Sequence, residues 1–168
     1  ALLVIRRVRV AYVDAFRHQA VRDAYRGIAS EILLALRGKQ LGAFITSVST
    51  GGTFREVSPH LRQRHPTLYM GGAVLIDVDI SSLKNHERDV LTRVEIPRAF
   101  EMRDEIAQKE GLILSPKGAA CAALATELQA KLPPDQIIVA LNPDAGQRYL
   151  GWEDKPLFKS QHLAKVPE

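Results

Sequence analysis

Residues Ser49 to Thr53 read STGGT and form the segment best suited to bind a small anion. They follow the apolar run GAFITSVS, which is typical of a buried strand, and they precede the helix-like run TFREVSPHLRQRHP. Gly51 and Gly52 carry no Cβ atom, so backbone N–H groups at these positions can approach a ligand closely. Ser49, Thr50 and Thr53 add hydroxyl groups, and the N-terminal end of the following helix is electropositive. Together these features fit a phosphate group.

The pattern alone leaves two interpretations of STGGT open: a phosphate-binding loop, or an ordinary tight turn between a strand and a helix. The segment is not a P-loop, because no Gly-Lys-Ser/Thr follows it, and it lacks the spacing G-x-G-x-x-G. In open α/β sheets, ligands bind at the carboxyl ends of strands, which is where this segment stands. The segment therefore predicts an anion site without identifying the anion.

The elements that must position this segment alternate between strand-like and helix-like patterns. The expected helices lie at 20–39, 53–66 and 97–111, with an alanine-rich helix before Pro133-Pro134. The expected strands lie at 8–14, 42–49, 67–80 (one or two strands split by Gly71-Gly72), 89–96, 112–114 and near 135–141. We predict one α/β domain at residues 1–150, a three-layer α/β/α fold with a mostly parallel sheet of five or six strands, followed by a C-terminal tail at 151–168.

Composition excludes several classes of protein. The net charge of +4 is mildly basic, which suits an anionic ligand but is too small and dispersed to predict a nucleic-acid partner. The single cysteine, Cys121, permits no internal disulfide, so a reducing compartment, the cytoplasm, is expected. No apolar run approaches the roughly 18 residues of a membrane span. The five histidines are scattered, so no metal site is expected.

Four segments together resemble the fold-type II pyridoxal-phosphate enzymes, the group of cysteine synthase, threonine synthase and threonine dehydratase. ITSVSTGGTFREVSPHLRQRHP is similar to the cysteine synthase segment in which Gly-Thr-Gly-Gly-Thr holds the cofactor phosphate. RAFEMRDEIAQKEGLILSPKGAACAAL resembles the later helix, Glu-Gly-Leu/Ile turn and Gly-Ala-Ala helix. IIVALNPDAGQRYL resembles the ending with Ser-Gly-Glu-Arg-Tyr-Leu, and YVDAF the strand Tyr-x-Asp-Gln-Phe. The segments occur in family order between Val8 and Leu150.

The resemblance implies pyridoxal 5'-phosphate as the cofactor, and β-replacement or β-elimination on an O-activated serine or threonine as the reaction. It implies that the cofactor phosphate binds at 49–53, that 115–118 faces the pyridine nitrogen, and that 144–146 lies near the same ring edge. The residues expected to bind the cofactor are Ser49, Thr50, Gly51, Gly52, Thr53, Ser115 and Asp144. The implied partners are an amino-acid substrate and either a second copy, as a homo-oligomer, or a lysine-bearing segment.

The sequence departs from the family pattern at several points. In the family, the Schiff-base lysine and the loop that grips the substrate carboxylate precede everything matched here, so we expect that segment to be absent from this chain and assign no catalytic residue. Ser49 stands where the family usually has glycine, and Lys117 where many members have serine or threonine. Two alternatives therefore stay open: a non-catalytic remnant acting as an interaction or anion-binding module, and a generic anion- or nucleotide-binding domain.

Overall fold

The computed structural model describes residues 19–75, 83 and 86–154. The helices in this part are α1 (Gln19–Leu36), α2 (Gly52–Arg62), α3 (Ile96–Glu110), α4 (Pro116–Gln129) and the short 3-10 helix η1 (Gly146–Tyr149). The strands are β1 (Leu41–Ser47), β2 (Tyr69–Val74), β3 (Asp89–Arg93) and β4 (Ile137–Ala140). The strand predicted at 8–14 lies outside the described residues, so the predicted total of five or six strands stays a prediction.

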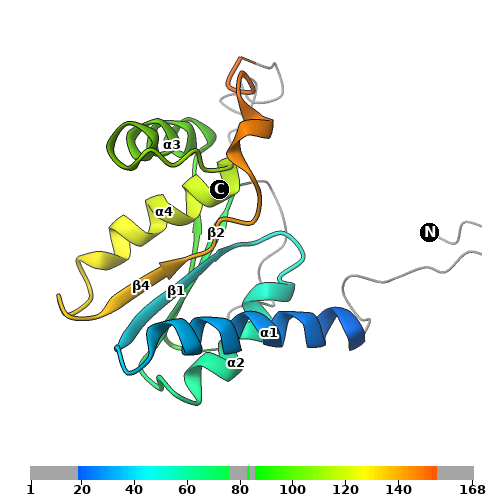
Figure 1. The fold of residues 1–168 in the computed structure, drawn as a ribbon, viewed down its shortest axis with the longest axis vertical. Coiled ribbons are helices and arrows are strands. Elements are labelled where there is room, and N and C mark those ends of the chain that lie inside the picture. Colours follow the sequence, from blue (N-terminus) through cyan, green and yellow to red (C-terminus); the bar gives the residue numbers. More distant parts are fainter. Residues whose placement is uncertain (1–18, 76–82, 84–85, 155–168) are drawn as a thin grey trace, which may run out of the picture.

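The four strands form one sheet in the order β3-β2-β1-β4, and every pairing is parallel (Figure 1). In the inner strand β1, Ile45 pairs with Gly71 of β2 on one side and with Ala140 of β4 on the other. The carboxyl ends of β1 and β4 therefore emerge at the same edge of the sheet. This edge is where the anion-binding segment was expected.

Helices cover both faces of the sheet, which confirms the predicted three-layer α/β/α fold (Figure 1). Phe44 of β1 packs in the cluster that includes α1 and α2, whereas Ile45 packs in the cluster that includes α3 and α4. This alternation follows from the two-residue period of a strand. Both residues are fully buried, as expected for a parallel sheet covered on both faces. Within the described residues, no helix has the length and apolar character that crossing a bilayer requires.

The predicted break at Gly71-Gly72 is wrong, because β2 runs through both glycines as one strand. A Cβ atom on Gly71 would lie 2.8 Å from Cγ1 of Ile45, and one on Gly72 would lie 2.8 Å from Cγ2 of Val48. The glycines therefore let neighbouring side chains approach the strand on its two faces. The two adjacent glycines predict a strand break, but in the structure they allow close packing within one strand.

The short strand predicted at 112–114 is also wrong, since these residues make only an isolated bridge between Leu114 and Ala145. Helix α4 starts directly at Pro116, because Ser115 caps it with its side chain. The helix ends at Gln129, before the two prolines that were expected to stop it. The bridge between Leu114 and Ala145 places the residues just before α4 against the segment that follows β4.

Candidate phosphate and cofactor site

The STGGT segment forms a tight turn between β1 and α2 that requires glycine at two positions. Gly51 is the N-cap of α2 and has a φ of 76°, in the left-handed region that other residues seldom adopt. A Cβ atom on Gly51 would lie 2.5 Å from Cδ2 of Leu83. A Cβ atom on Gly52 would lie 2.7 Å from Cε2 of Tyr25. Neighbouring side chains therefore lie close to both glycines, and the backbone at these two positions carries no side chain of its own.

The N-terminus of α2 presents backbone N–H groups that no acceptor within the helix binds. The first N–H groups of a helix, here those of Gly52, Thr53 and Phe54, have no acceptor within the helix. The N–H of Gly52 has a long 3.4 Å contact with Oγ1 of Thr50, and Gly51 offers no side chain as a cap. No acidic residue stands in the first turn. These donors and the positive end of the helix dipole fit the phosphate of a cofactor.

Two further side chains flank the turn, and sequence reasoning missed both. Nη2 of Arg55 lies 3.5 Å from the carbonyl oxygen of Thr50. The hydroxyl of Tyr25 lies 3.1 Å from the Cβ position of Gly52. The spacing of four residues between Gly51 and Arg55 was a readable signal, because residues four apart lie on one side of a helix. Tyr25 gave no such signal, since only the packing of α1 against α2 places it there.

Ser115 lies at the start of α4, with both its hydroxyl proton and a lone pair already in use. Its Oγ accepts a hydrogen bond from the N–H of Gly118 at 3.0 Å. Its hydroxyl donates to Oδ1 of Asn142 at 3.0 Å, and its own backbone N–H donates to the same oxygen at 3.2 Å. The residue is 0% exposed. Asn142 is a further residue that the sequence reasoning did not select, because its role depends on the contact between β4 and α4.

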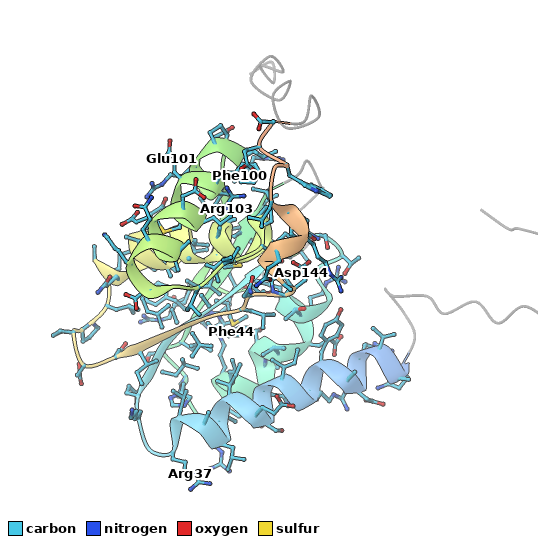
Figure 2. All side chains as sticks on the ribbon, turned by 45° about the horizontal axis from the view of Figure 1, so that its top comes forward. Arg37, Phe44, Phe100, Glu101, Arg103 and Asp144 are labelled. Atoms are coloured by element: carbon cyan, nitrogen blue, oxygen red, sulfur yellow. The ribbon has the colours of Figure 1, made fainter. Side chains whose placement is uncertain are left out.

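Asp144 follows β4 and is half-buried beside η1 (Figure 2). Oδ2 of its carboxylate accepts a hydrogen bond from the hydroxyl of Tyr149 at 2.9 Å. This hydrogen bond raises the pKa of Tyr149 above its ordinary value. The other oxygen, Oδ1, is buried and has no hydrogen-bond partner among the described residues. The bridge from Leu114 to Ala145 holds the segments of Ser115 and Asp144 together.

All seven predicted site residues lie along the carboxyl edge of the sheet. Ser49 to Thr53 leave this edge after β1, Asp144 leaves it after β4, and the contact with Asn142 attaches Ser115 to it. The turn fits a phosphate group by the donors described above. Among the described residues, no lysine is buried in the way that a lysine forming a Schiff base with the cofactor aldehyde would need to be. Lys39, Lys109 and Lys131 are exposed, and Lys117 is partly buried in the first turn of α4.

Sequence comparison finds relatives among the cysteine synthases. The probable cysteine synthase of Bacillus subtilis (strain 168) is 30% identical over 159 aligned residues, which take in 80% of this chain and 51% of that enzyme. The cysteine synthase of Helicobacter pylori (strain J99) is 28% identical over 146 residues, or 75% of this chain and 47% of the enzyme. No protein-family model matches the chain. The chain spans about half the length of the curated relatives it matches.

Solved structures share the fold. O-ureido-L-serine synthase superposes with a TM-score of 0.71 and 23% identity, over 91% of this chain and 54% of that one. A hydrogen sulfide-producing enzyme from Fusobacterium nucleatum superposes with a TM-score of 0.68 and 21% identity, over 82% of this chain and 48% of that one. The sequence matches support the relationship to the cysteine synthases, and the superpositions support the fold. The chain is a relative of the cysteine synthases, in the fold-type II pyridoxal-phosphate family, over about half the length of those enzymes.

Proposed function

We propose that this chain is the large-domain part of a pyridoxal-phosphate enzyme that carries out β-replacement or β-elimination on an O-activated serine or threonine. The observation that supports it best is the glycine turn at the carboxyl end of β1, with Gly51 in the left-handed region and, behind it, the N-terminus of α2, to which the N-cap residue gives no side-chain hydrogen bond. The relationship to the cysteine synthases supplies the reaction class. In this proposal residues 1–150 form the domain and 151–168 a tail.

The chain's own residues would hold the phosphate end of the cofactor. The N–H groups of Gly52, Thr53 and Phe54 would donate to phosphate oxygens, and the hydroxyls of Ser49 and Thr50 would complete the shell. Arg55 would add a positive charge next to the turn. A cation in the first turn of a helix is opposed by the helix dipole, and a bound dianion at the same place would offset that cost.

Pyridoxal phosphate supplies an electron sink that lets the α-proton and then the β-substituent of an amino acid leave. That chemistry requires a lysine with a lowered pKa, which burial and neighbouring charges produce. None of the lysines in the described part is fully buried. The proposal therefore places the Schiff-base lysine, and the groups that grip the substrate carboxylate, outside the described residues. It also places the protein in the cytoplasm, as a homo-oligomer or paired with the lysine-bearing segment.

The test is to purify the protein from its source with the cofactor bound, reduce it with borohydride and map the lysine that carries the pyridoxyl group by mass spectrometry. Intact mass from the same sample is compared with the 18.6 kDa of this sequence. We expect one labelled lysine, a mass that includes its segment or a co-purifying chain that supplies it, and turnover of O-acetylserine with sulfide. Absence of both the labelled lysine and turnover would contradict the proposed enzymatic function.

The alternative function is a non-catalytic member of the same fold that binds an anion or a partner protein. Lys117 favours it. This residue stands in the first turn of α4, where many family members have a serine or threonine in the segment that faces the pyridine nitrogen. A charged lysine cannot accept a hydrogen bond as a hydroxyl can. This alternative predicts that the protein binds phosphate compounds at the glycine turn without a labelled lysine. The borohydride experiment therefore separates the two functions.

A further inference from the structure

An open pocket lies at the edge of the sheet where β1 and β2 begin, opposite the edge that carries the glycine turn. Its volume is about 550 Å³, and its lining comes from the end of α1, from the loop 38–40 before β1, and from Arg64 and His65 after α2. Figure 2 shows Arg37, which follows α1 at this end, well away from Asp144. Small-molecule sites commonly have volumes of this order. The pocket is therefore separate from the candidate cofactor site.

The lining combines apolar side chains with basic ones. The last turns of α1 supply three leucines: Leu33, Leu34 and Leu36. Leu34 leaves 63% of its surface exposed, which is a large apolar area for a side chain on a helix. The basic groups are the ammonium of Lys39, the guanidinium of Arg64 and the imidazole of His65, and no aspartate or glutamate is among the described residues of the lining. Apolar surface beside unopposed positive charge fits an anion with an apolar tail.

The basic groups have hydrogen-bonding capacity that no described residue uses. Lys39 and Arg64 form no ion pair with another residue in the described part of the chain. In the ring of His65, Nδ1 is buried without a hydrogen-bond partner among the described residues, whereas Nε2 is accessible. A proton on a buried nitrogen without an acceptor is unfavourable, so the neutral ring carries its proton on Nε2. The pocket thus offers three kinds of donor to one anion.

The helix ends restrict which anion fits. Both α1 and α2 end beside the pocket, so the negative ends of their dipoles lie there. Basic residues at such ends are common because they interact favourably with the dipole, and that effect accounts for the charges but not for the exposed Leu34 in the same lining. The same dipoles oppose a dianion such as phosphate more strongly than a monoanion. A monocarboxylate therefore fits better than a phosphate.

We propose that this pocket binds an aliphatic monocarboxylate. The carboxylate accepts hydrogen bonds from the guanidinium of Arg64, the ammonium of Lys39 and Nε2 of His65, in the charge-assisted geometry that arginine favours. The aliphatic chain lies on the leucines of α1, where it removes apolar surface from water. The inference does not depend on the proposed function, because the pocket shares no residue with the glycine turn.

The experiment titrates the full chain, labelled with ¹⁵N, with hexanoate and follows the backbone amides by NMR. The N–H of Gly38 reports on the pocket and that of Gly52 on the glycine turn. We expect a saturable shift at Gly38, with a Kd of about 1 mM or below, and no shift at Gly52. Acetate has the carboxylate without the chain, and hexan-1-ol has the chain without the charge. Each should bind at least about tenfold more weakly than hexanoate.

Two variants separate the charged and apolar contacts. Arg64→Ala should weaken hexanoate binding about tenfold, and Leu34→Ser about threefold or more. Both side chains are exposed, so the fold should tolerate the changes. Arg55→Ala, at the other end of α2, is the charge-matched control and should bind hexanoate as the wild type does.

Four results would overturn the inference. The first is a wild type without a saturable shift at Gly38, and the second is a shift at Gly52 in its place, which would put hexanoate at the glycine turn. The third is hexan-1-ol binding as tightly as hexanoate, because the basic groups would then contribute nothing. The fourth is equal weakening in Arg64→Ala and Arg55→Ala, because affinity would then follow net charge alone.

Discussion

The guanidinium of Arg103 binds both carboxylate oxygens of Glu153, Nη1 to Oε2 at 3.2 Å and Nη2 to Oε1 at 3.3 Å. Arg103 lies on α3 with a side chain that is 6% exposed, and its guanidinium also packs on the ring of Phe100 (Figure 2). Glu153 follows η1, four residues after Tyr149, whose hydroxyl holds Asp144. The ion pair thus connects α3 to the chain segment that contains a predicted site residue. The division of the chain after residue 150 stays a prediction.

The first prediction concerns Glu153→Gln. Loss of the carboxylate leaves a nearly buried guanidinium with Asp104 as its remaining anion among the described residues, so we expect the free energy of unfolding to fall by about 1 kcal/mol. Glu153 is 41% exposed, and solvent screening keeps the effect modest. The matched control is Glu101→Gln on the same helix, where both members of the Arg98 pair are about half exposed or more. Urea unfolding of the control should differ little from that of the wild type.

The same pair gives a pH dependence. The hydrogen bond from Arg103 lowers the pKa of Glu153 below its ordinary 4.5 in the folded protein. The folded state therefore binds fewer protons than the unfolded state, and the pair stabilises the fold above about pH 4.5. This stabilisation should disappear as the pH falls through the lowered folded-state value. Unfolding curves of wild type and Glu153→Gln should converge below pH 4.5; a constant difference down to the most acidic conditions would contradict this.

The second prediction concerns the glycine turn. Gly51→Ala puts a Cβ at a φ of 76° and against Leu83, and we expect it to cost about 1 to 2 kcal/mol of unfolding free energy. The control is Gly27→Ala inside α1, where a Cβ meets nothing within 4 Å. That change should stabilise the protein by about 0.5 to 1 kcal/mol. Equal effects at both positions in thermal or urea unfolding would refute the role assigned to Gly51.

The third prediction concerns Arg55. Its guanidinium lies next to the turn, so Arg55→Ala should weaken binding of pyridoxine 5'-phosphate about tenfold while leaving the unfolding free energy nearly unchanged. Arg64, an exposed residue just beyond the opposite end of α2, is the charge-matched control. Arg64→Ala should bind as the wild type does. Calorimetric titration measures both, and an equal loss in the two variants would indicate a general charge effect.

The fourth prediction concerns Cys121. The thiol is buried on α4, and burial raises its pKa to about 12. Since the thiolate is the reactive form, the native protein should resist iodoacetamide at pH 8, and the unfolded protein should react fully. Mass spectrometry of the alkylated protein reports the difference. Rapid labelling of the native state would show that α4 does not pack as described.

The helices with clear punctuation were predictable from the sequence. Pro97 and Gly111 bracket α3, and the structure places Gly111 at the C-cap with a φ of 69°. The apolar run of β1 identified a buried strand correctly. Two predictions were wrong: the break at Gly71-Gly72 and the strand at 112–114. In both cases the packing of neighbouring elements decides the structure, since β2 passes through the two glycines and α4 starts without a preceding strand. Such tertiary effects leave little trace in local patterns.

The candidate site likewise contains residues that local sequence predicts and residues that it does not. The glycine turn was predictable, because two adjacent glycines after a buried strand indicate a backbone that a ligand can approach closely. Tyr25 and Asn142 were missed, because nothing in their own neighbourhood marks them. One is brought by α1 and the other by β4, from residues distant in sequence. Arg55 is the intermediate case, with a helical spacing that could have been used.

The most direct test of the central claim is the binding of pyridoxine 5'-phosphate to this chain, measured by calorimetry beside unphosphorylated pyridoxine and beside Gly52→Ala. A Cβ on Gly52 would lie 2.7 Å from Tyr25, so the variant should distort the turn without touching the rest of the edge. We expect saturable binding at one site per chain, at least tenfold weaker binding of pyridoxine, and loss of this difference in Gly52→Ala. Equal affinity for the two ligands in the wild type would contradict a phosphate site at the glycine turn.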